Sequence, residues 1–261
     1  MAPHDDAADE ADRLQRRWQR LAASPHRDYY VASHGGWSEG ATWNRHAEFD
    51  VIALTWGVDE DWLRGQHVLE IGCGVGRLAP VLAPRVRSYT GFDIAPGMVA
   101  EARARASGDP GVRFFEADGT TVPAGARDRS YGFVFSHAVL IHCPLAVIEA
   151  LLQSCGGVLA RGGVLRLQLR ADATDPTGIE PAPDILPPHA PPDSTADLPT
   201  DAQLEADVDD VGGYMGHAFG FAEARDFLRA LGLGPVTVRR FDQNFVYAWI
   251  TREAEHRRAD D

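Results

Sequence analysis

The segment HVLEIGCGVGRL, residues 67–78, limits the fold of this chain more than any other feature. A short apolar run, typical of a buried strand, leads to Glu70 and then to glycines at every second position: Gly72, Gly74 and Gly76. A glycine-rich turn after a strand lets a nucleotide lie against the backbone at the start of a helix. The spacing excludes two common motifs. A dinucleotide-binding turn has its third glycine three residues after the second, and a P-loop ends in Gly-Lys-Ser/Thr.

The middle of the chain alternates strand-like with helix-like segments. Such alternation predicts a parallel sheet with helices on both faces. The expected strands are 67–72, 88–93, 112–117, 131–137 and 163–169, and the expected helices are 76–84, 96–107 and 144–155. Two later segments, VTVRRFD and NFVYAWITRE, are separated by a short turn and predict a closing antiparallel hairpin.

The region before this alternation has two parts. Residues 7–22 carry an apolar stripe with the spacing of an amphipathic helix. From 24 to 48 this pattern is lost, and aromatic residues such as Tyr30 and Trp43 are mixed with His and Gly. Such a segment is either a cap over a pocket or an irregular packing layer.

The acidic residues of the chain are concentrated in one segment. Residues 172–210 contain eleven Asp or Glu and no Lys or Arg, so the rest of a chain with net charge −13 is nearly neutral. Residues 172–200 also hold eight of the 17 prolines, which disfavour helix and interior strand. The segment is either a solvated excursion or a lid over a site. Neither it nor the rest of the chain provides a basic surface for nucleic acid.

Length and cysteine content limit the class of protein further. A chain of 261 residues accommodates one α/β domain with additions. Cys73, Cys143 and Cys155 are odd in number and scattered, which predicts free thiols rather than disulfides or a zinc site. No segment has the roughly 18 apolar residues of a membrane span, and the charged N-terminal residues do not resemble a signal peptide. We therefore expect a cytoplasmic protein with no membrane, nucleic-acid or metal partner; the sequence does not indicate an oligomeric state.

The ends of the expected strands resemble the motifs of class I S-adenosylmethionine-dependent methyltransferases. The E-x-G-x-G-x-G turn is similar to their first motif. In YTGFDIAPGM, the resemblance implies that Asp93 accepts both ribose hydroxyls, that Ile94 packs on adenine, and that Met98 lies close by. In VRFFEADGT, it implies that Asp118 and Gly119 lie near the adenine amino edge. Asp118 is alternatively the cap of a turn.

The fourth strand, YGFVFSHAVLIHCP, continues the resemblance. It implies that Ser136 and His137 lie over the methionine part of the cofactor. The chain departs from the family at Gly132, where an acid usually stands, and we expect this to weaken a structural contact rather than the site. The resemblance covers residues 66–170 and, more loosely, 219–253.

The resemblance implies a Rossmann-like α/β fold with S-adenosyl-L-methionine as cofactor. The expected sheet has seven strands, mostly parallel, in the order 3-2-1-4-5-7-6, with the last strand antiparallel. We expect a helical and aromatic cap in 1–60, the binding core in 61–171, the insertion in 172–215 and the rest of the core in 216–261. The cofactor site is assigned to Glu70, Gly72, Cys73, Gly74, Gly76, Arg77, Asp93, Ile94, Met98, Asp118, Gly119, Ser136, Tyr30 and Trp43.

Two histidines are candidates for a general base, because imidazole titrates near neutrality. They are His137 and His142, the latter in VLIHCP, which resembles a segment of ubiquinone-pathway O-methyltransferases. Each is alternatively a packed or capping histidine. Tyr214 and His217 are candidate substrate contacts, or packing residues after the insertion.

The expected reaction is N- or O-methylation of a small molecule, with secondary metabolism as a plausible setting. The motifs of DNA amino- and cytosine-methyltransferases are missing from the positions after the fourth strand. Three alternatives stay open: an enzyme that uses the cofactor without methylating, a non-catalytic binding module, and a nicotinamide oxidoreductase. The glycine spacing already conflicts with the last.

Overall fold

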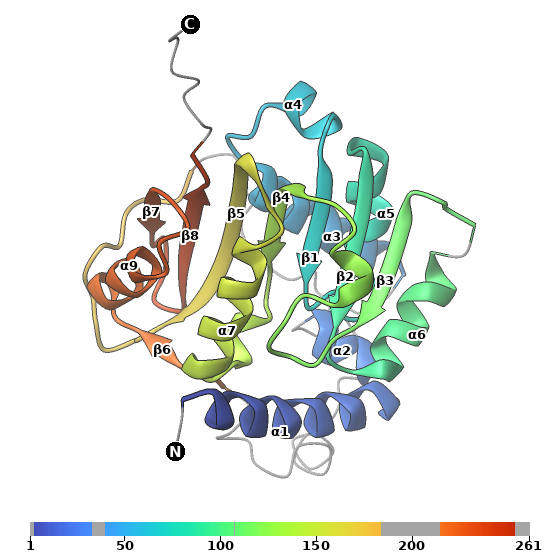
Figure 1. The fold of residues 1–261 in the computed structure, drawn as a ribbon, viewed down its shortest axis with the longest axis horizontal. Helices are drawn as coiled ribbons and strands as arrows, with labels where there is room; N and C mark the ends of the chain where they lie inside the picture. Colours follow the sequence, from blue (N-terminus) through green and yellow to red (C-terminus); the bar gives the residue numbers. More distant parts are fainter. Residues whose placement is uncertain (1–2, 33–39, 107, 184–214, 254–261) are drawn as a thin grey trace, which may run out of the picture.

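The fold is a single mixed sheet with helices on both faces, and the computed structural model describes residues 3–32, 40–106, 108–183 and 215–253 (Figure 1). The strands are β1 His67–Ile71, β2 Ser88–Asp93, β3 Val112–Glu116, β4 Tyr131–Ser136, β5 Leu159–Ala171, β6 Ala218–Phe219, β7 Val236–Arg239 and β8 Phe245–Thr251. The α-helices are α1 Pro3–Ala23, α2 Arg27–Ala32, α3 Gly40–Thr55, α4 Glu60–Arg64, α5 Ala79–Leu82, α6 Pro96–Arg105, α7 Leu145–Gly156 and α9 Phe221–Ala230. Short 3-10 turns lie at Ala83–Arg85, Ala124–Ala126 and Leu140–His142.

The strand order is β3-β2-β1-β4-β5-β8-β7, with β6 paired to the end of β5. The pairs among β1 to β5 are parallel, whereas β8 runs antiparallel to both β5 and β7. The predicted fold class and the antiparallel last strand are confirmed. The two-residue strand β6 is additional, so β7 and β8 occupy the places expected for strands six and seven.

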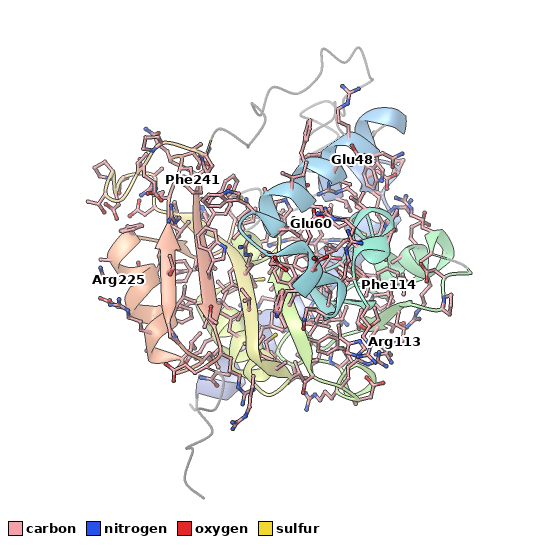
Figure 2. The ribbon with its side chains drawn as sticks, turned by 90° about the horizontal axis from the view of Figure 1, so that it is seen from above. Glu48, Glu60, Arg113, Phe114, Arg225 and Phe241 are labelled. Atoms are coloured by element: carbon pink, nitrogen blue, oxygen red, sulfur yellow. The ribbon has the colours of Figure 1, made fainter. Side chains whose placement is uncertain are left out.

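The sheet is buried on both faces by two separate apolar clusters. One cluster joins β-strand residues to α1, α7 and α9, and the other joins them to α3, α4, α5 and α6. In β4, Val134 belongs to the first cluster while Phe133 and Phe135 belong to the second, because successive side chains of a strand point to opposite faces. In Figure 2, Arg225 on α9 and Arg113 on β3 mark the two ends of the sheet.

Between residues 24 and 48, where the apolar periodicity is lost, the structure contains α2 and much of α3, so the described part of this segment is helical rather than irregular. In α3, the buried face contains Ala47 and Val51 but also His46 and Asp50. These two polar residues are buried among other charged groups rather than in apolar surroundings. They therefore interrupt the apolar periodicity from which a helix is predicted.

Helix α1 lies across the carboxyl ends of the central strands (Figure 1). The Gln15 side-chain amide donates to the carbonyl of Ile94 at 3.3 Å, and Gln19 accepts from the backbone N–H of Gly97 at 2.9 Å. The helix predicted for residues 7–22 is confirmed, and these contacts attach it to the edge of the sheet where ligands bind in such folds.

The beginning of the acidic insertion is attached to the sheet by Arg240, which is fully buried. Its guanidinium donates to the backbone carbonyls of Asp172, Asp175, Asp242 and Gln243. Residues 172–183 contain no helix or strand, in agreement with their proline content. The remainder of the insertion lies outside the described residues.

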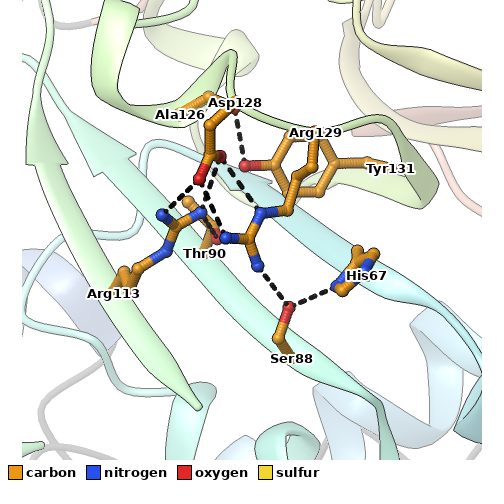
Figure 3. A network of polar contacts seen from close by, with 8 residues as sticks. All are labelled: His67, Ser88, Thr90, Arg113, Ala126, Asp128, Arg129 and Tyr131. Atoms are coloured by element: carbon orange, nitrogen blue, oxygen red, sulfur yellow. Dashed lines mark hydrogen bonds and ion pairs between the residues drawn. The ribbon is translucent and has the colours of Figure 1, made fainter. Parts of the chain in front are cut away.

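The opposite, amino edge of the sheet carries a network of polar side chains (Figure 3). Asp128 accepts from the guanidinium groups of Arg113 and Arg129, each at 2.9 Å at its shortest. Arg129 also donates to Ser88 at 3.4 Å, and the Ser88 hydroxyl lies 2.7 Å from Nδ1 of His67. The network lies at the surface, and the Asp128 side chain is 46% exposed.

Candidate active site

An open cavity of about 920 Å³, including its solvent-filled mouth, lies at the carboxyl edge of the sheet. It is lined by the ends of β1 and β2, the glycine turn, the residues that follow β4, and residues of α1, α2, α6 and α7. The strand order reverses between β1 and β4, so the cavity lies where doubly wound sheets bind their ligands.

The glycine turn has a backbone that other residues rarely adopt. Gly72, Gly74 and Gly76 have φ of +70°, +51° and +74°. A Cβ on Gly72 would overlap the side chain of Val139, whereas a Cβ on Gly74 would lie 3.5 Å from the nearest methyl group of Val31. Gly72 and Gly74 line the cavity, so the turn presents backbone to the ligand space.

Asp93 holds the glycine turn in place from the end of β2. One carboxylate oxygen accepts from the N–H of Gly74 at 2.8 Å, and the other accepts from the N–H of Ala95 at 2.9 Å. Burial raises the pKa of this carboxyl, and the backbone hydrogen bonds oppose the shift. Each oxygen keeps a lone pair beyond these bonds, and Asp93 lines the cavity.

One end of the cavity is apolar. Ile94, Met98 and Gly119 line it, as the sequence predicted for cofactor contacts, and the Gly119 position has no room for a Cβ because of Ile94. Leu14 and Trp18 of α1 complete this wall. The sequence analysis assigned those two residues to the apolar stripe of a helix but not to the site, because a stripe does not reveal which surface it covers.

The carboxylate of Asp118 faces its own turn. Its oxygens accept four hydrogen bonds from the backbone and hydroxyl groups of Thr120 and Thr121, at 2.7 to 3.1 Å. Burial works against these bonds, but together they lower the pKa of Asp118. Asp118 is not among the residues that line the cavity, although its neighbour Gly119 is.

A buried cluster of charged residues forms the other end of the site. Arg77 follows the glycine turn and its Nη2 lies 2.5 Å from Oδ2 of Asp50 on α3. Arg77 lines the cavity, and its Nη1 is buried with no hydrogen-bond partner in the described part of the chain. An anionic group of a ligand would satisfy this nitrogen, because buried polar groups are rarely left unpaired.

Asp50 is a residue beside the site that the sequence analysis did not name. Its Oδ1 lies 3.2 Å from Nε2 of His137, and its Oδ2 lies 3.6 Å from Nε2 of His46. Burial alone would raise the pKa of Asp50, but His137 and Arg77 reverse this effect and hold the pKa well below its usual range. A lone Asp in a segment without apolar periodicity gave no signal by which it could be found.

Glu70 lies between these two ends of the site and is buried. Burial raises its pKa to about 8; Arg77 opposes this shift, and the charges of Asp93 and Asp50 add to it. The hydroxyl of Tyr89 donates to its carboxyl group. Glu70 is thus largely protonated at neutral pH and adds little charge to the cavity.

The other predicted cofactor residues lie in or beside the cavity. Tyr30 and Cys73 line it, and burial raises the pKa of the Cys73 thiol well above its ordinary value. Gly76 instead packs towards Ala102 and Phe114. Like Asp118 and Gly76, two further residues lie outside the lining: Ser136, whose buried hydroxyl has no partner among the described residues, and Trp43, whose ring centroid lies 5.9 Å from the Arg77 guanidinium.

Of the two candidate bases, His137 lines the cavity and His142 does not. His142 is buried, with its ring edge-on to Trp18 at a centroid distance of 5.3 Å. His217 lies outside the lining too, with Nε2 2.9 Å from a carboxylate oxygen of Glu223. Tyr214 lies outside the described residues.

The described residues contain no group of three or more side chains that could hold a metal ion, and none of their helices is long and apolar enough to cross a membrane. All three cysteines are free and buried.

Solved structures share this fold. Magnesium protoporphyrin IX methyltransferase from Synechocystis PCC 6803, with bound SAH (S-adenosylhomocysteine), aligns with a TM-score of 0.58 at 17% identity, over 94% of this chain and 100% of that chain. An S-adenosylmethionine-dependent methyltransferase from Mesorhizobium loti aligns with a TM-score of 0.53 at 18% identity, over 78% and 98% of the two chains. The fold is therefore the Rossmann-like fold that these methyltransferases share.

Sequence comparison agrees with the fold. A family model described as a methyltransferase domain matches residues 68–163. Trans-aconitate 2-methyltransferase from Methylobacterium nodulans is 34% identical over 42% of this chain and 41% of its own length, and ubiquinone biosynthesis O-methyltransferase from Paracidovorax citrulli is 28% identical over 50% and 55%. The chain thus spans about half the length of the curated relatives it matches. Residues 68–163 thus form the part of the chain that is similar to a methyltransferase domain.

Proposed function

We propose that this protein transfers a methyl group from S-adenosyl-L-methionine to a small-molecule acceptor. The observation that carries the proposal is a single cavity that combines three elements: the glycine turn, the carboxylate of Asp93 and the unpaired Nη1 of Arg77. The first two suit an adenosine, and the third suits the carboxylate of an amino acid. S-adenosylmethionine contains both parts.

We assign the cofactor contacts by chemistry. The free lone pairs of Asp93 accept from the two ribose hydroxyls, and the adenine ring lies in the apolar end, near Ile94 and Gly119. Arg77 Nη1 binds the methionine carboxylate. One lone pair on Oδ2 of Asp118 remains beyond its single hydrogen bond from Thr121, so a contact with the adenine amino group stays part of the proposal.

Bound cofactor would supply an electrophilic methyl group, and the residues of the chain would align the acceptor with it and exclude water. His137 is the candidate base because it alone of the two predicted histidines lines the cavity. The acceptor is proposed to be a small molecule, methylated on N or O, in agreement with the names of the relatives that act on trans-aconitate and in ubiquinone biosynthesis.

Titration calorimetry with S-adenosylmethionine and S-adenosylhomocysteine tests the cofactor assignment. Asp93→Ala should weaken both ligands by about tenfold or more, because hydrogen bonds to a charged group contribute roughly 1.5 to 3 kcal/mol each. The matched control is Asp128→Ala at the opposite edge of the sheet, which should bind as the wild type does. Unchanged affinity in a folded Asp93→Ala protein would contradict the ribose assignment.

Product analysis with methyl-labelled cofactor tests the reaction. Label in an acceptor supports methyl transfer. Cofactor consumed with no labelled acceptor would indicate a non-methylating reaction such as cyclisation. Tight binding without turnover on any acceptor would indicate a binding module, and the absence of cofactor binding would refute the proposal.

A further inference from the structure

Asp50 divides its partners between its two carboxylate oxygens. Oδ2 lies 2.5 Å from Nη2 of Arg77 and 3.6 Å from Nε2 of His46, whereas Oδ1 lies 3.2 Å from Nε2 of His137. The Asp50 side chain is only 4% exposed, so this division does not depend on water. The residues come from α3, the glycine turn and the end of β4, and they meet beside the cavity.

The contact at Oδ1 determines which ring nitrogen of His137 carries the proton. A carboxylate can only accept, and the Arg77 guanidinium, 2.5 Å from Oδ2, lowers the pKa of Asp50 and keeps it ionised. Nε2 of His137 is therefore the donor, and the neutral ring has its lone pair on Nδ1. Asp50 thus sets the tautomer of a histidine that lines the cavity, as an acid orients a catalytic histidine in other enzymes, but with the roles of the two ring nitrogens exchanged.

The charges around His137 favour an oxygen nucleophile over a protonated amine. Arg77 is cationic, and His46 adds positive charge when it is protonated, while Asp50 is the nearest anion. Glu70, on β1, has a pKa raised to about 8 and is largely neutral near pH 7. Tyr247, on β8, has a pKa raised by burial and is neutral there too. An ammonium ion entering this site would lie near an arginine, whereas a neutral hydroxyl can give its proton to Nδ1 of His137.

On the basis of the proposed function, we infer that Asp50 and His137 form a general-base pair and that the acceptor group is a hydroxyl. The hydroxyl proton passes to Nδ1 of His137 while the oxygen forms its bond to the methyl carbon. The methyl–sulfur bond breaks with its electron pair left on sulfur, and the imidazolium later releases the proton to water. His137 acts on the acceptor directly, and Asp50 is a positioning residue.

The first test reads the tautomer of His137 by NMR of protein with ¹⁵N-labelled histidine, with and without S-adenosylhomocysteine. The signal is assigned by its loss in His137→Gln. We expect the Nε2–H tautomer in the wild type and a loss of this preference in Asp50→Asn. His67→Gln, at the amino edge of the sheet, is the matched control and should leave the His137 signal unchanged.

This measurement separates the two proposals. The Nδ1–H tautomer in the wild type would overturn the general-base pair, even if Asp50→Asn fails to fold and even if S-adenosylhomocysteine binds normally. Conversely, failure of S-adenosylhomocysteine to bind in calorimetry would refute the proposed function, while the tautomer of the ligand-free protein would still decide the Asp50–His137 pair.

The second test identifies the acceptor group with matched small molecules and methyl-labelled cofactor. Each pair consists of a phenol and the aniline or benzylamine of the same shape. We expect label in the phenols. His137→Gln should reduce kcat for para-methylphenol by roughly 100-fold to 10,000-fold, with S-adenosylhomocysteine affinity unchanged. The loss should be much smaller for para-nitrophenol at a pH where it is already ionised. Equal losses for the two phenols would overturn the base, and label in the amines alone or in no pair would overturn the hydroxyl assignment.

Discussion

The two edges of the sheet each contain an aspartate held by two nitrogen-bearing side chains, and the two aspartates differ in their burial. At the amino edge, Asp128 accepts from Arg113 and Arg129, and its side chain is 46% exposed (Figure 3). At the carboxyl edge, Asp50 is bound by Arg77 and His137, and its side chain is 4% exposed. Both pKa values are held well below the usual range.

Exposure to water explains why the two aspartates contribute differently to stability, although both are paired with an arginine. Around Asp128, solvent screens the charges, and such surface pairs contribute little to stability. Around Asp50, both charges have lost their hydration, so removal of one partner leaves the other without compensation. The buried cluster also borders a cavity, where a fixed charge can act on a ligand. Burial, more than the identity of the partners, thus distinguishes Asp50 from the surface carboxylate of Asp128.

The largest effect is expected for Asp50→Ala. This change leaves the buried guanidinium of Arg77 with neither Asp50 at Nη2 nor a described partner at Nη1. Breaking a buried pair in this way costs about 3 to 5 kcal/mol of unfolding free energy. Urea unfolding monitored by circular dichroism measures the cost. A loss no larger than that of Asp128→Ala would contradict the contrast between the two edges.

A second prediction concerns pH. Glu70 has a pKa raised to about 8 in the folded protein, so the folded state binds more protons than the unfolded state between about pH 4.5 and 8. The stability that depends on this proton is fully present below that range and is lost as the pH rises through it. Glu70→Gln keeps the protonated shape and should flatten this loss, which we expect to be on the order of 3 kcal/mol.

To test this prediction, the unfolding free energies of the wild type and of Glu70→Gln are measured at about pH 4.5 and about pH 8. The two proteins should differ least at the acidic end and most at the alkaline end, with the variant the more stable. Parallel curves across the range would show that Glu70 does not hold its proton.

A third prediction compares two glycines with the same backbone angle. Gly72 and Gly57 both have φ of +70°, but a Cβ on Gly72 would overlap Val139, whereas a Cβ on Gly57 would meet nothing within 4 Å. Gly57→Ala should cost about 1 kcal/mol from the backbone alone, and Gly72→Ala should cost roughly 1 to 3 kcal/mol more from overpacking. Thermal or urea unfolding of both variants measures the difference. Equal costs would mean that Val139 moves aside freely.

The smallest effect is expected for Asp128→Asn. Because the pKa of Asp128 is lowered by its arginines, its contribution is present above the pKa of the unfolded carboxyl and is lost as the pH falls below it. Near neutral pH, moderate salt should abolish whatever difference separates variant and wild type, since exposed charges are screened. A salt-resistant loss of stability in urea unfolding would show that this network is not the surface feature described here.

Local patterns in the sequence were sufficient for the architecture. The strands around the glycine turn and the antiparallel last strand follow from periodicity and turn spacing, which reflect interactions of near neighbours. The order of the sheet follows from the family resemblance. Met98, Ile94 and Gly119 were predicted as cofactor residues and line the cavity, because the ends of parallel strands necessarily meet at one edge.

The sequence by itself thus determined the sheet and the position of its ligand edge. Only the tertiary structure decided which polar groups face the cavity. Asp50, Arg77 and His137 are far apart in the chain and meet through long-range packing. The polar residues on the buried face of α3 interrupt the apolar periodicity from which a helix is predicted. Tertiary contacts likewise separated the two candidate histidines, with His137 towards the cavity and His142 against Trp18. A local pattern records which residues are apolar, but a buried charge is stable only beside partners that folding brings to it.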